Sequence, residues 1–239
     1  MKIVILLIGS FIASVISGAA GFGGSLLLLP VVTMCIGAEL SVPVLTLAQL
    51  IGNLARVSAG YKEISWKHVG LFSVTALPLA ALGAFGFSIL PKAMVTRFVG
   101  AGLILLVLLK LFAKKELPAD NRTFLLGGAL TGGLSGLVGS GGPIGAAVFL
   151  ALGLSPVGYI ASEAMTAVLM HVVKTIIYGK FAGMTLQAGI LGLAMGFSML
   201  IGTYVARHFI RNMPKDKFKT YVTILLLVVG LYMLITGNK

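Results

Sequence analysis

The chain has 239 residues, of which 58% are hydrophobic and only 10% are charged. Soluble domains carry about a quarter of their residues as charged side chains, so this composition excludes a water-soluble protein and predicts one embedded in lipid. The formal net charge is +12. The basic residues lie in short loops between apolar segments, which indicates membrane topology and excludes a nucleic-acid partner. The single cysteine, Cys35, excludes an internal disulfide or a zinc scaffold.

Ten apolar segments follow one another along the chain. A helix needs about 20 residues to cross the roughly 30 Å hydrocarbon core of a bilayer. Six segments approach this length, namely residues 41–60, 69–90, 95–113, 157–178, 186–206 and 221–236. Four are too short to span comfortably, namely residues 3–17, 25–36, 123–138 and 143–153, and they form two pairs, each joined by glycines. The pattern predicts an all-α polytopic membrane protein.

The two pairs of short segments reveal an internal repeat. The Ser- and Gly-rich stretch at residues 17–24 aligns with residues 135–142 at an offset of 118, and five of the eight positions are identical. The same offset aligns Asn53 with His171 and Arg56 with Lys174. We therefore predict two homologous repeats, residues 1–113 and 123–239, joined by a polar linker at residues 114–122.

The distribution of basic residues predicts the orientation of the repeats. If each glycine-joined pair enters and leaves the membrane on one side, or crosses it twice, each repeat makes an odd number of crossings and the two repeats are inverted. If each pair is instead one broken helix that crosses once, each repeat makes four crossings and the repeats are parallel. Inversion places ten basic residues on one side and five on the other, whereas the parallel arrangement gives eight and seven. The larger set is Lys62, Lys67, Lys114, Lys115, Arg122, Arg207, Arg211, Lys215, Lys217 and Lys219. The positive-inside rule therefore predicts inverted repeats, a cytoplasmic linker and both termini outside the cytoplasm.

The glycine-rich tips between the short helices are candidate anion sites. Backbone that leaves a helix within a membrane must be shielded by protein or line a hydrated cavity. A helix that starts at such a tip presents free N–H groups and a partial positive charge, and two inverted copies would aim both helix starts at the midplane. The predicted backbone donors are Gly23, Gly24 and Ser25 in the first repeat and Gly141, Gly142 and Pro143 in the second, with Pro143 suited to a first helical turn.

Polar residues inside the apolar segments form the second group of candidates. Gln49, Asn53 and Arg56 are spaced to share one helix face, and the second repeat has a comparable stripe made of Glu163, Thr166, His171 and Lys174. We expect Asn53 and His171 to bind substrate and the two cations to attract anions. The alternative is that the amides join neighbouring helices and the cations reach the headgroups. Glu163 is a coupling candidate with two possible states. Near a cation it would stay ionised as a salt-bridge partner, whereas in a dry pocket it would hold a proton and could couple transport to pH, as could His171.

The tips also resemble a known family. Gly21-Phe-Gly-Gly24 followed by Leu-Leu-Leu-Leu-Pro30, the matching Gly139-Ser-Gly-Gly-Pro143, and the passage that ends at Trp66 are similar to the TauE/SafE sulfite exporters. The resemblance covers nearly the whole chain, and it implies a membrane permease for sulfur-containing anions such as sulfite or sulfonates. The sequence differs from many members after the first tip, where it has Gln49-Leu-Ile-Gly-Asn53.

These patterns together favour a secondary transporter of a small, sulfur-containing anion in the bacterial inner membrane, working by alternating access around a midplane site. The alternatives are an anion channel with a fixed pore and an intramembrane enzyme. Convergent acid-base or metal-binding residues are not evident in the sequence, so we predict no catalysis, metal or cofactor. The sequence leaves open the exact substrate, the direction, proton coupling, homo-oligomerisation, and whether the short helices are re-entrant or fully crossing.

Overall fold

The computed structural model describes residues 2–22, 24–89 and 118–210, together with the isolated residues Pro214, Lys217, Thr220 and Ile224. The predicted segment at 95–113 lies outside these residues, as do Gly23, the first part of the linker and, apart from Ile224, the segment at 221–236. Every regular element in the described ranges is helical, which confirms the predicted all-α class.

The helices of the first predicted repeat are α1 (Lys2–Ala20), α2 (Gly24–Ile36), α3 (Ala38–Gly60) and α4 (Trp66–Ile89), with a 3-10 turn η1 (Tyr61–Glu63) before α4. Those of the second are α6 (Asn121–Val138), α7 (Gly142–Leu150), α8 (Pro156–Phe181) and α9 (Leu186–Ile210). Local signals set several of these boundaries. Asp120 accepts the N–H of Thr123 at 2.8 Å and caps α6, and Ser155 accepts the N–H of Gly158 at 2.9 Å and caps α8.

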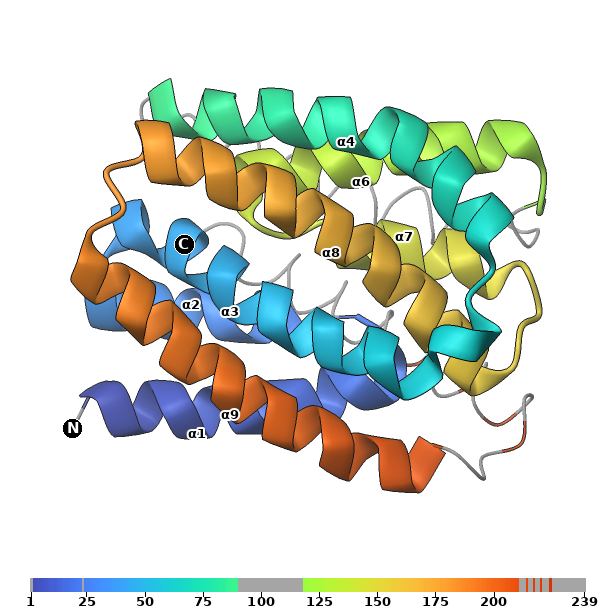
Figure 1. The fold of residues 1–239 in the computed structure, drawn as a ribbon, viewed down its shortest axis with the longest axis horizontal. Coiled ribbons are helices and arrows are strands. Elements are labelled where there is room, and N and C mark those ends of the chain that lie inside the picture. The colour runs from blue at the N-terminus through green and yellow to red at the C-terminus, as the bar shows by residue number, and fades with distance from the viewer. Residues whose placement is uncertain are drawn as a thin grey trace.

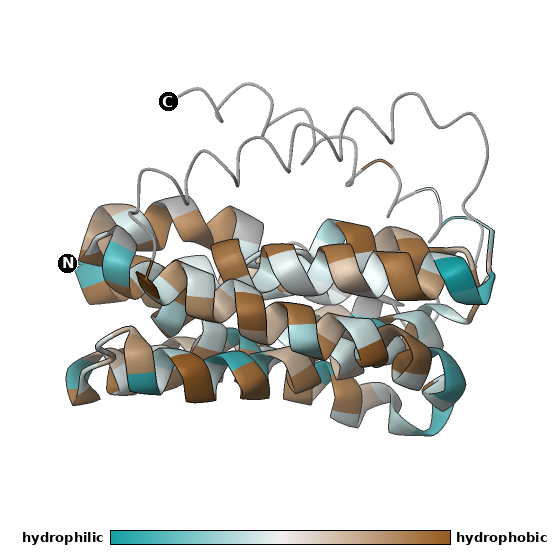
Figure 2. Ribbon diagram, turned by 90° about the horizontal axis from the view of Figure 1, so that it is seen from above, coloured by the Kyte–Doolittle hydropathy of each residue, from teal (hydrophilic) through white to brown (hydrophobic). Residues whose placement is uncertain are grey.

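Four helices are long and apolar enough to cross a bilayer: Glu39–Glu63, Trp66–Ile89, Pro156–Phe181 and Leu186–His208. They correspond to four of the six predicted long segments. Strongly hydrophilic positions gather mostly near the two ends of the bundle, whereas much of the middle is apolar (Figure 2). Large apolar side chains such as Leu82 and Leu126, each 66% exposed, cover the outer faces, as expected for helices that contact lipid. The chain is an integral membrane protein.

The centre of the bundle is formed by α3 and α8, which lie between the pair α4 and α6 on one side and the pair α1 and α9 on the other (Figure 1). The two central helices run antiparallel, because Gly60 near the end of α3 packs on Val157 and Ala161 in the first turns of α8. In the predicted repeats, α1 corresponds to α6, α3 to α8 and α4 to α9. The helix contacts follow this correspondence: α1 packs on α9 as α6 packs on α4, and α3 packs on α9 as α8 packs on α4. Each repeat therefore packs its outer helices mainly against the other repeat.

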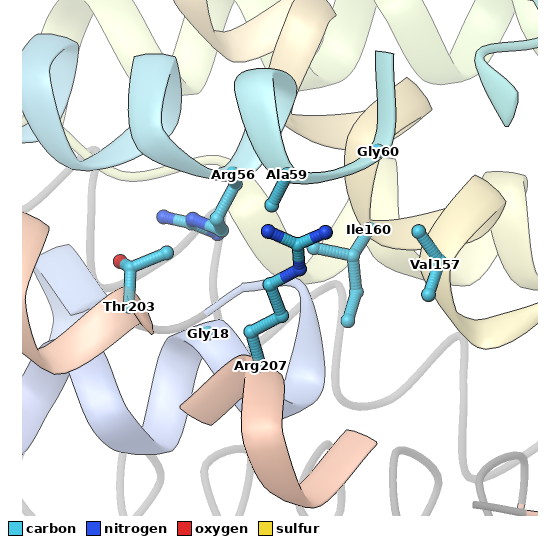
Figure 3. A pocket seen from close by; sticks show the side chains of 8 residues that line it. All are labelled: Gly18, Arg56, Ala59, Gly60, Val157, Ile160, Thr203 and Arg207. Atoms are coloured by element: carbon cyan, nitrogen blue, oxygen red, sulfur yellow. The ribbon is translucent and has the colours of Figure 1, made fainter. Parts of the chain in front are cut away.

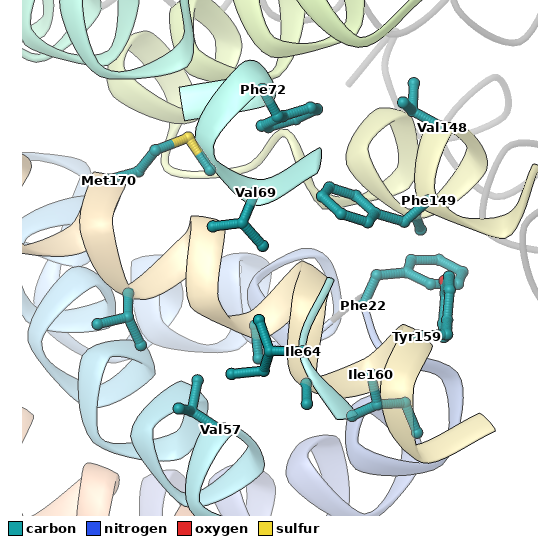
Figure 4. Close-up of a cluster of buried hydrophobic side chains, with 14 of the residues drawn as sticks. Phe22, Val57, Ile64, Val69, Phe72, Val148, Phe149, Tyr159, Ile160 and Met170 are labelled. Atoms are coloured by element: carbon teal, nitrogen blue, oxygen red, sulfur yellow. The ribbon is translucent and has the colours of Figure 1, made fainter. Parts of the chain in front are cut away.

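Small residues allow the outer pairs to approach closely. Three glycines of α6 lie so close to α4 that an added Cβ atom would collide with a backbone carbonyl of α4. Gly128 faces the carbonyl of Phe72, Gly132 that of Ala76, and Gly136 that of Ala80. The register advances by four residues on both helices, so α4 and α6 run parallel. Beside them, the ring centroids of Phe72 and Phe124 each lie 5.4 Å from that of Phe149. All three rings belong to one apolar cluster, in which Figure 4 shows Phe72 and Phe149. This packing fixes α7 against α4 and α6.

The short helices form hairpins that enter and leave at one end of the bundle. The ammonium of Lys2 at the start of α1 donates to the carbonyl of Cys35 near the end of α2, at 3.1 Å. In the second repeat, Gly127 near the start of α6 contacts Val148 near the end of α7. Because α2 has 13 residues and α7 has nine, they span only about 20 Å and about 14 Å, less than a roughly 30 Å hydrocarbon core. The glycine tips therefore lie within the bundle.

Candidate functional site: a polar cavity between two glycine tips

The two glycine tips have matching backbone conformations and meet in the bundle. Gly21 ends α1 with φ +83°, and Gly139 ends α6 with φ +77°, both in the left-handed region that favours glycine. The N–H of Gly21 donates to Ser17 at 2.7 Å, and that of Gly139 donates to Ser135 at 2.9 Å. Beyond these turns, the hydroxyl of Ser25 donates to that of Ser140 at 3.2 Å. The hydrogen bond joins the tip of one repeat to the tip of the other.

A cavity of about 30 Å³ lies between the tips and the central helices. One ordered water needs roughly 10–15 Å³ of such space, so the cavity has room for water or a small ligand. The lining residues come from both tips and from α3 and α8: Gly21, Phe22, Gly24, Ser25, Gln49, Asn53, Arg56, Ser135, Gly139, Gly141, Gly142, Glu163, Ala167, Met170 and His171. Gly24 begins α2 and Gly142 begins α7, so both helix starts border the cavity with their positively polarised N–H groups.

Five of the lining side chains are polar, almost fully buried and incompletely hydrogen-bonded. Each of them is at most 6% exposed. Within the described part of the chain, the following buried atoms have no hydrogen-bond partner: Gln49 Nε2, Asn53 Oδ1, Arg56 Nε, Glu163 Oε2 and His171 Nδ1. A buried polar atom left unpaired costs about 1–3 kcal/mol. Their concentration around one cavity therefore indicates a site that takes up water or a polar ligand.

Arg56 connects the two central helices to the first tip. Its Nη1 donates to the carbonyl of Gly21 at 2.9 Å and lies 4.0 Å from Oε2 of Glu163 on α8. Glu163 thus lies beside a cation, the condition under which we predicted a salt-bridge partner; its role as a proton carrier stays a prediction. The guanidinium faces the negative end of α1, and its charge is partly balanced by the carboxylate. A ligand anion in the cavity would compete with Glu163 for this cation.

Lys174, aligned with Arg56 in the repeat, has a different position. Its ammonium donates to the carbonyl of Ser135 at 3.2 Å and to the hydroxyl of the same residue at 2.8 Å. The side chain is fully buried but is not among those that line the cavity. Lys174 thus binds the last turn of α6, just as Arg56 binds the end of α1. It influences the cavity only through its charge.

Most of the residues predicted from sequence are brought together by the fold. Those that line the cavity are Gly24, Ser25, Gln49, Asn53, Arg56, Gly141, Gly142, Glu163 and His171. Gly23 lies outside the described residues. Pro143 occupies the first turn of α7, and Thr166 donates its hydroxyl to the carbonyl of Glu163 at 2.7 Å; neither lines the cavity. Two serines were missed: Ser135, which lines the cavity, and Ser140, which accepts the hydrogen bond from Ser25. Their position in the repeated Ser- and Gly-rich stretch could have identified them.

Comparison with known proteins gives one match. The family described as sulfite exporter TauE/SafE matches residues 6–233, nearly the whole chain. No curated protein and no solved structure matches. The match agrees with the membrane-spanning helices and with the glycine tips on which the resemblance was based. The chain therefore belongs to the TauE/SafE family of sulfite exporters.

Proposed function

We propose that this protein is a secondary transporter that moves a small, sulfur-containing anion, sulfite or an organosulfonate, across the bacterial inner membrane. Membership of the sulfite exporter family supports this substrate class. Transport would occur by alternating access, in which the two repeats expose the central cavity first to one side of the membrane and then to the other. The cavity is small, which favours a compact anion in this conformation.

The observation that carries the proposal is the group of unpaired, buried polar atoms between two helix starts. The N–H groups around Gly24 and Ser25 and around Gly141 and Gly142 would donate to the oxyanion, because helix N-termini bind anions through free donors and a favourable dipole. Asn53 and His171 would add side-chain hydrogen bonds. Arg56 would supply the nearest positive charge, and Lys174 would raise the potential of the cavity from further away.

We further propose that residues 1–113 and 123–239 are inverted repeats, with the linker in the cytoplasm and both termini outside. The antiparallel course of α3 and α8 and the paired helix contacts between the repeats support this arrangement. So does the excess of basic residues on the side of the linker. In an inverted pair, each repeat can rock against the other around one fixed site.

The decisive experiment is transport in proteoliposomes that contain the purified protein. We expect uptake of labelled sulfite or of a small organosulfonate that saturates and shows counterflow, measured with and without a pH gradient, with empty liposomes as the control. Thiosulfate tests how far the selectivity extends among sulfur oxyanions. Flux that does not saturate and lacks counterflow would indicate a channel with a fixed pore. Absence of flux for all three anions in either direction would overturn the proposal.

A further inference from the structure

A second cavity lies at the end of the bundle where α3 ends, and it opens towards the surface. It is lined by residues of α1, α3, α8 and α9: Gly18, Arg56, Ala59, Gly60, Val157, Ile160, Thr203 and Arg207 (Figure 3). Val157 lies in the first turn of α8 and Arg207 in the last turn of α9. The residues that line this cavity therefore lie at the same end of the bundle. Lys62 and Lys67, which belong to the predicted cytoplasmic side, follow α3 at this end.

Two arginines give this second cavity its charge. Arg56 extends into it from the buried side, and Arg207 extends into it from α9, where the residue is exposed (Figure 3). No acidic residue occurs among the eight described residues that line it. The other lining side chains are apolar or small, apart from the hydroxyl of Thr203. Two cations against walls of low polarity produce a positive potential that concentrates anions.

Arg56 is the one described residue that lines both the second cavity and the central cavity. It is 4% exposed, and its Nε has no hydrogen-bond partner. The guanidinium thus stands between the two spaces, held by the carbonyl of Gly21 and the carboxylate of Glu163. An anion that leaves one cavity for the other would pass this group.

Beyond the central cavity, towards the other end of the bundle, two fully buried side chains of α8 are engaged in hydrogen bonds with α6. There, Lys174 is hydrogen-bonded to Ser135, and the hydroxyl of Tyr178 donates to the carbonyl of Gly136. Tyr178 is fully buried and packs against Phe87 with ring centroids 5.4 Å apart. The second cavity, in contrast, reaches from Arg56 to exposed Arg207.

We propose that the second cavity is a vestibule on the cytoplasmic side, in which Arg207 and Arg56 form a staging site for a sulfonate- or sulfite-like anion before it enters the central cavity. This inference rests on the proposed transport function. Arg207 attracts the anion and Arg56 passes it inwards, exchanging its contact with Glu163 for one with the ligand. The vestibule therefore sets the rate of access from the cytoplasm.

The vestibule can be tested by thiol labelling, without measuring transport. In a chain with Cys35→Ser, a cysteine replaces Thr203, and its reaction with an anionic sulfonatoethyl thiosulfonate reagent is compared with that of a cationic trimethylammonium analogue. We expect the anionic reagent to be favoured. Arg207→Gln should lower the ratio of the two rates by at least about threefold, as loss of a unit charge within several ångströms predicts, and high salt should reduce the difference.

The matched control is Arg122→Gln, which removes an exposed arginine from the same predicted side at the start of α6. It should leave the ratio of rates unchanged, and methanesulfonate should protect the cysteine in the chain with Arg207. Ala59→Cys provides a second reporter position if the chain with Thr203→Cys does not fold. An equal ratio with and without Arg207, or an equal loss with Arg122→Gln, would overturn the vestibule. Charge-selective labelling without transport would instead overturn only the proposed function.

Discussion

The hydroxyls of Ser25 and Ser140 form a hydrogen bond at 3.2 Å between residues 115 positions apart in the chain. Ser140 directly follows the positive-φ turn at Gly139, and Ser25 lies four residues after the corresponding turn at Gly21, in the first turn of α2. Each turn ends the first helix of its predicted repeat. Two helix starts are thereby brought to one cavity, together with a group of unpaired, buried polar atoms. The predictions below separate the ligand-binding role of this arrangement from its structural role.

The first prediction concerns Asn53 and His171, which have unpaired buried atoms in the cavity. Asn53→Ala and His171→Ala should each abolish sulfite transport in proteoliposomes, because each removes a hydrogen-bonding group from the site, while membrane insertion and detergent-extracted yield stay normal. Ser73→Ala is the matched control, because Ser73 on α4 also has a buried, unpaired hydroxyl but does not line the cavity. Full activity in both cavity variants would remove these residues from the proposed site.

The second prediction concerns the pair Arg56 and Glu163. Glu163→Gln keeps the shape of the side chain but releases Arg56 from a negative charge 4.0 Å away. The attraction between two unit charges about 4 Å apart is worth roughly 1 kcal/mol in water and roughly 4 kcal/mol at the effective dielectric constant of a protein surface. The variant should therefore bind methanesulfonate about tenfold more tightly at equilibrium.

If Glu163 carries the coupling proton, the same variant should also lose any acceleration of uptake by a pH gradient. Glu63→Gln is the control, since Glu63 is an exposed carboxylate outside both cavities. Uptake in the Glu163 variant that responds to the gradient as the wild type does would assign coupling elsewhere.

The third prediction concerns Lys174, which is fully buried and has no carboxylate partner among the described residues. Its contact with the end of α6 contributes up to about 2 kcal/mol, whereas burying an ammonium costs several kcal/mol. The cost of burial is larger, so Lys174→Met should leave the melting temperature in detergent unchanged or higher. Sulfite transport should fall by about tenfold as the potential of the cavity drops. A melting temperature lower by several degrees would show that the lysine is retained for stability.

The fourth prediction concerns the two left-handed glycines. Gly21→Ala would place a Cβ 2.5 Å from Cε1 of Tyr159, and Gly139→Ala would place one 2.9 Å from Cγ1 of Val42. A left-handed conformation costs a non-glycine residue about 1–2 kcal/mol even without such contacts. Both variants should lower thermal stability in detergent. Gly133→Ala, on the same helix as the second turn but in open space, should be neutral or stabilise by about 0.5–1 kcal/mol; equal losses at all three positions would contradict the role of the turns.

The fifth prediction concerns topology. A reporter enzyme that is active only outside the cytoplasm, fused after Lys239, should be active, because inverted repeats place both termini outside. The same reporter inserted in the linker at residues 114–122 should be inactive, and a reporter that requires the cytoplasm should give the opposite pattern at both positions. A cytoplasmic readout at Lys239 would defeat the inverted topology.

Local sequence patterns predicted much of the fold. The four long helices are found where uninterrupted apolar residues are long enough to cross a bilayer, because lipid leaves the backbone no partner outside a helix. The glycine turns at Gly21 and Gly139 have the same φ region, as the aligned motifs suggested. The face shared by Gln49, Asn53 and Arg56 was also predicted, since three- and four-residue spacing places side chains on one side of a helix, and all three line the cavity.

The sequence by itself thus determined that the chain is a bundle of membrane helices with two similar glycine tips and a polar stripe on each central helix. Only the tertiary structure decided that the tips meet at Ser25 and Ser140, that Arg56 faces Glu163, and that Lys174 turns away to Ser135. The physical reason is that periodicity specifies the face of a helix but not the neighbour that the face meets. That neighbour depends on how closely all the helices pack, through contacts such as those of Gly128, Gly132 and Gly136 with α4.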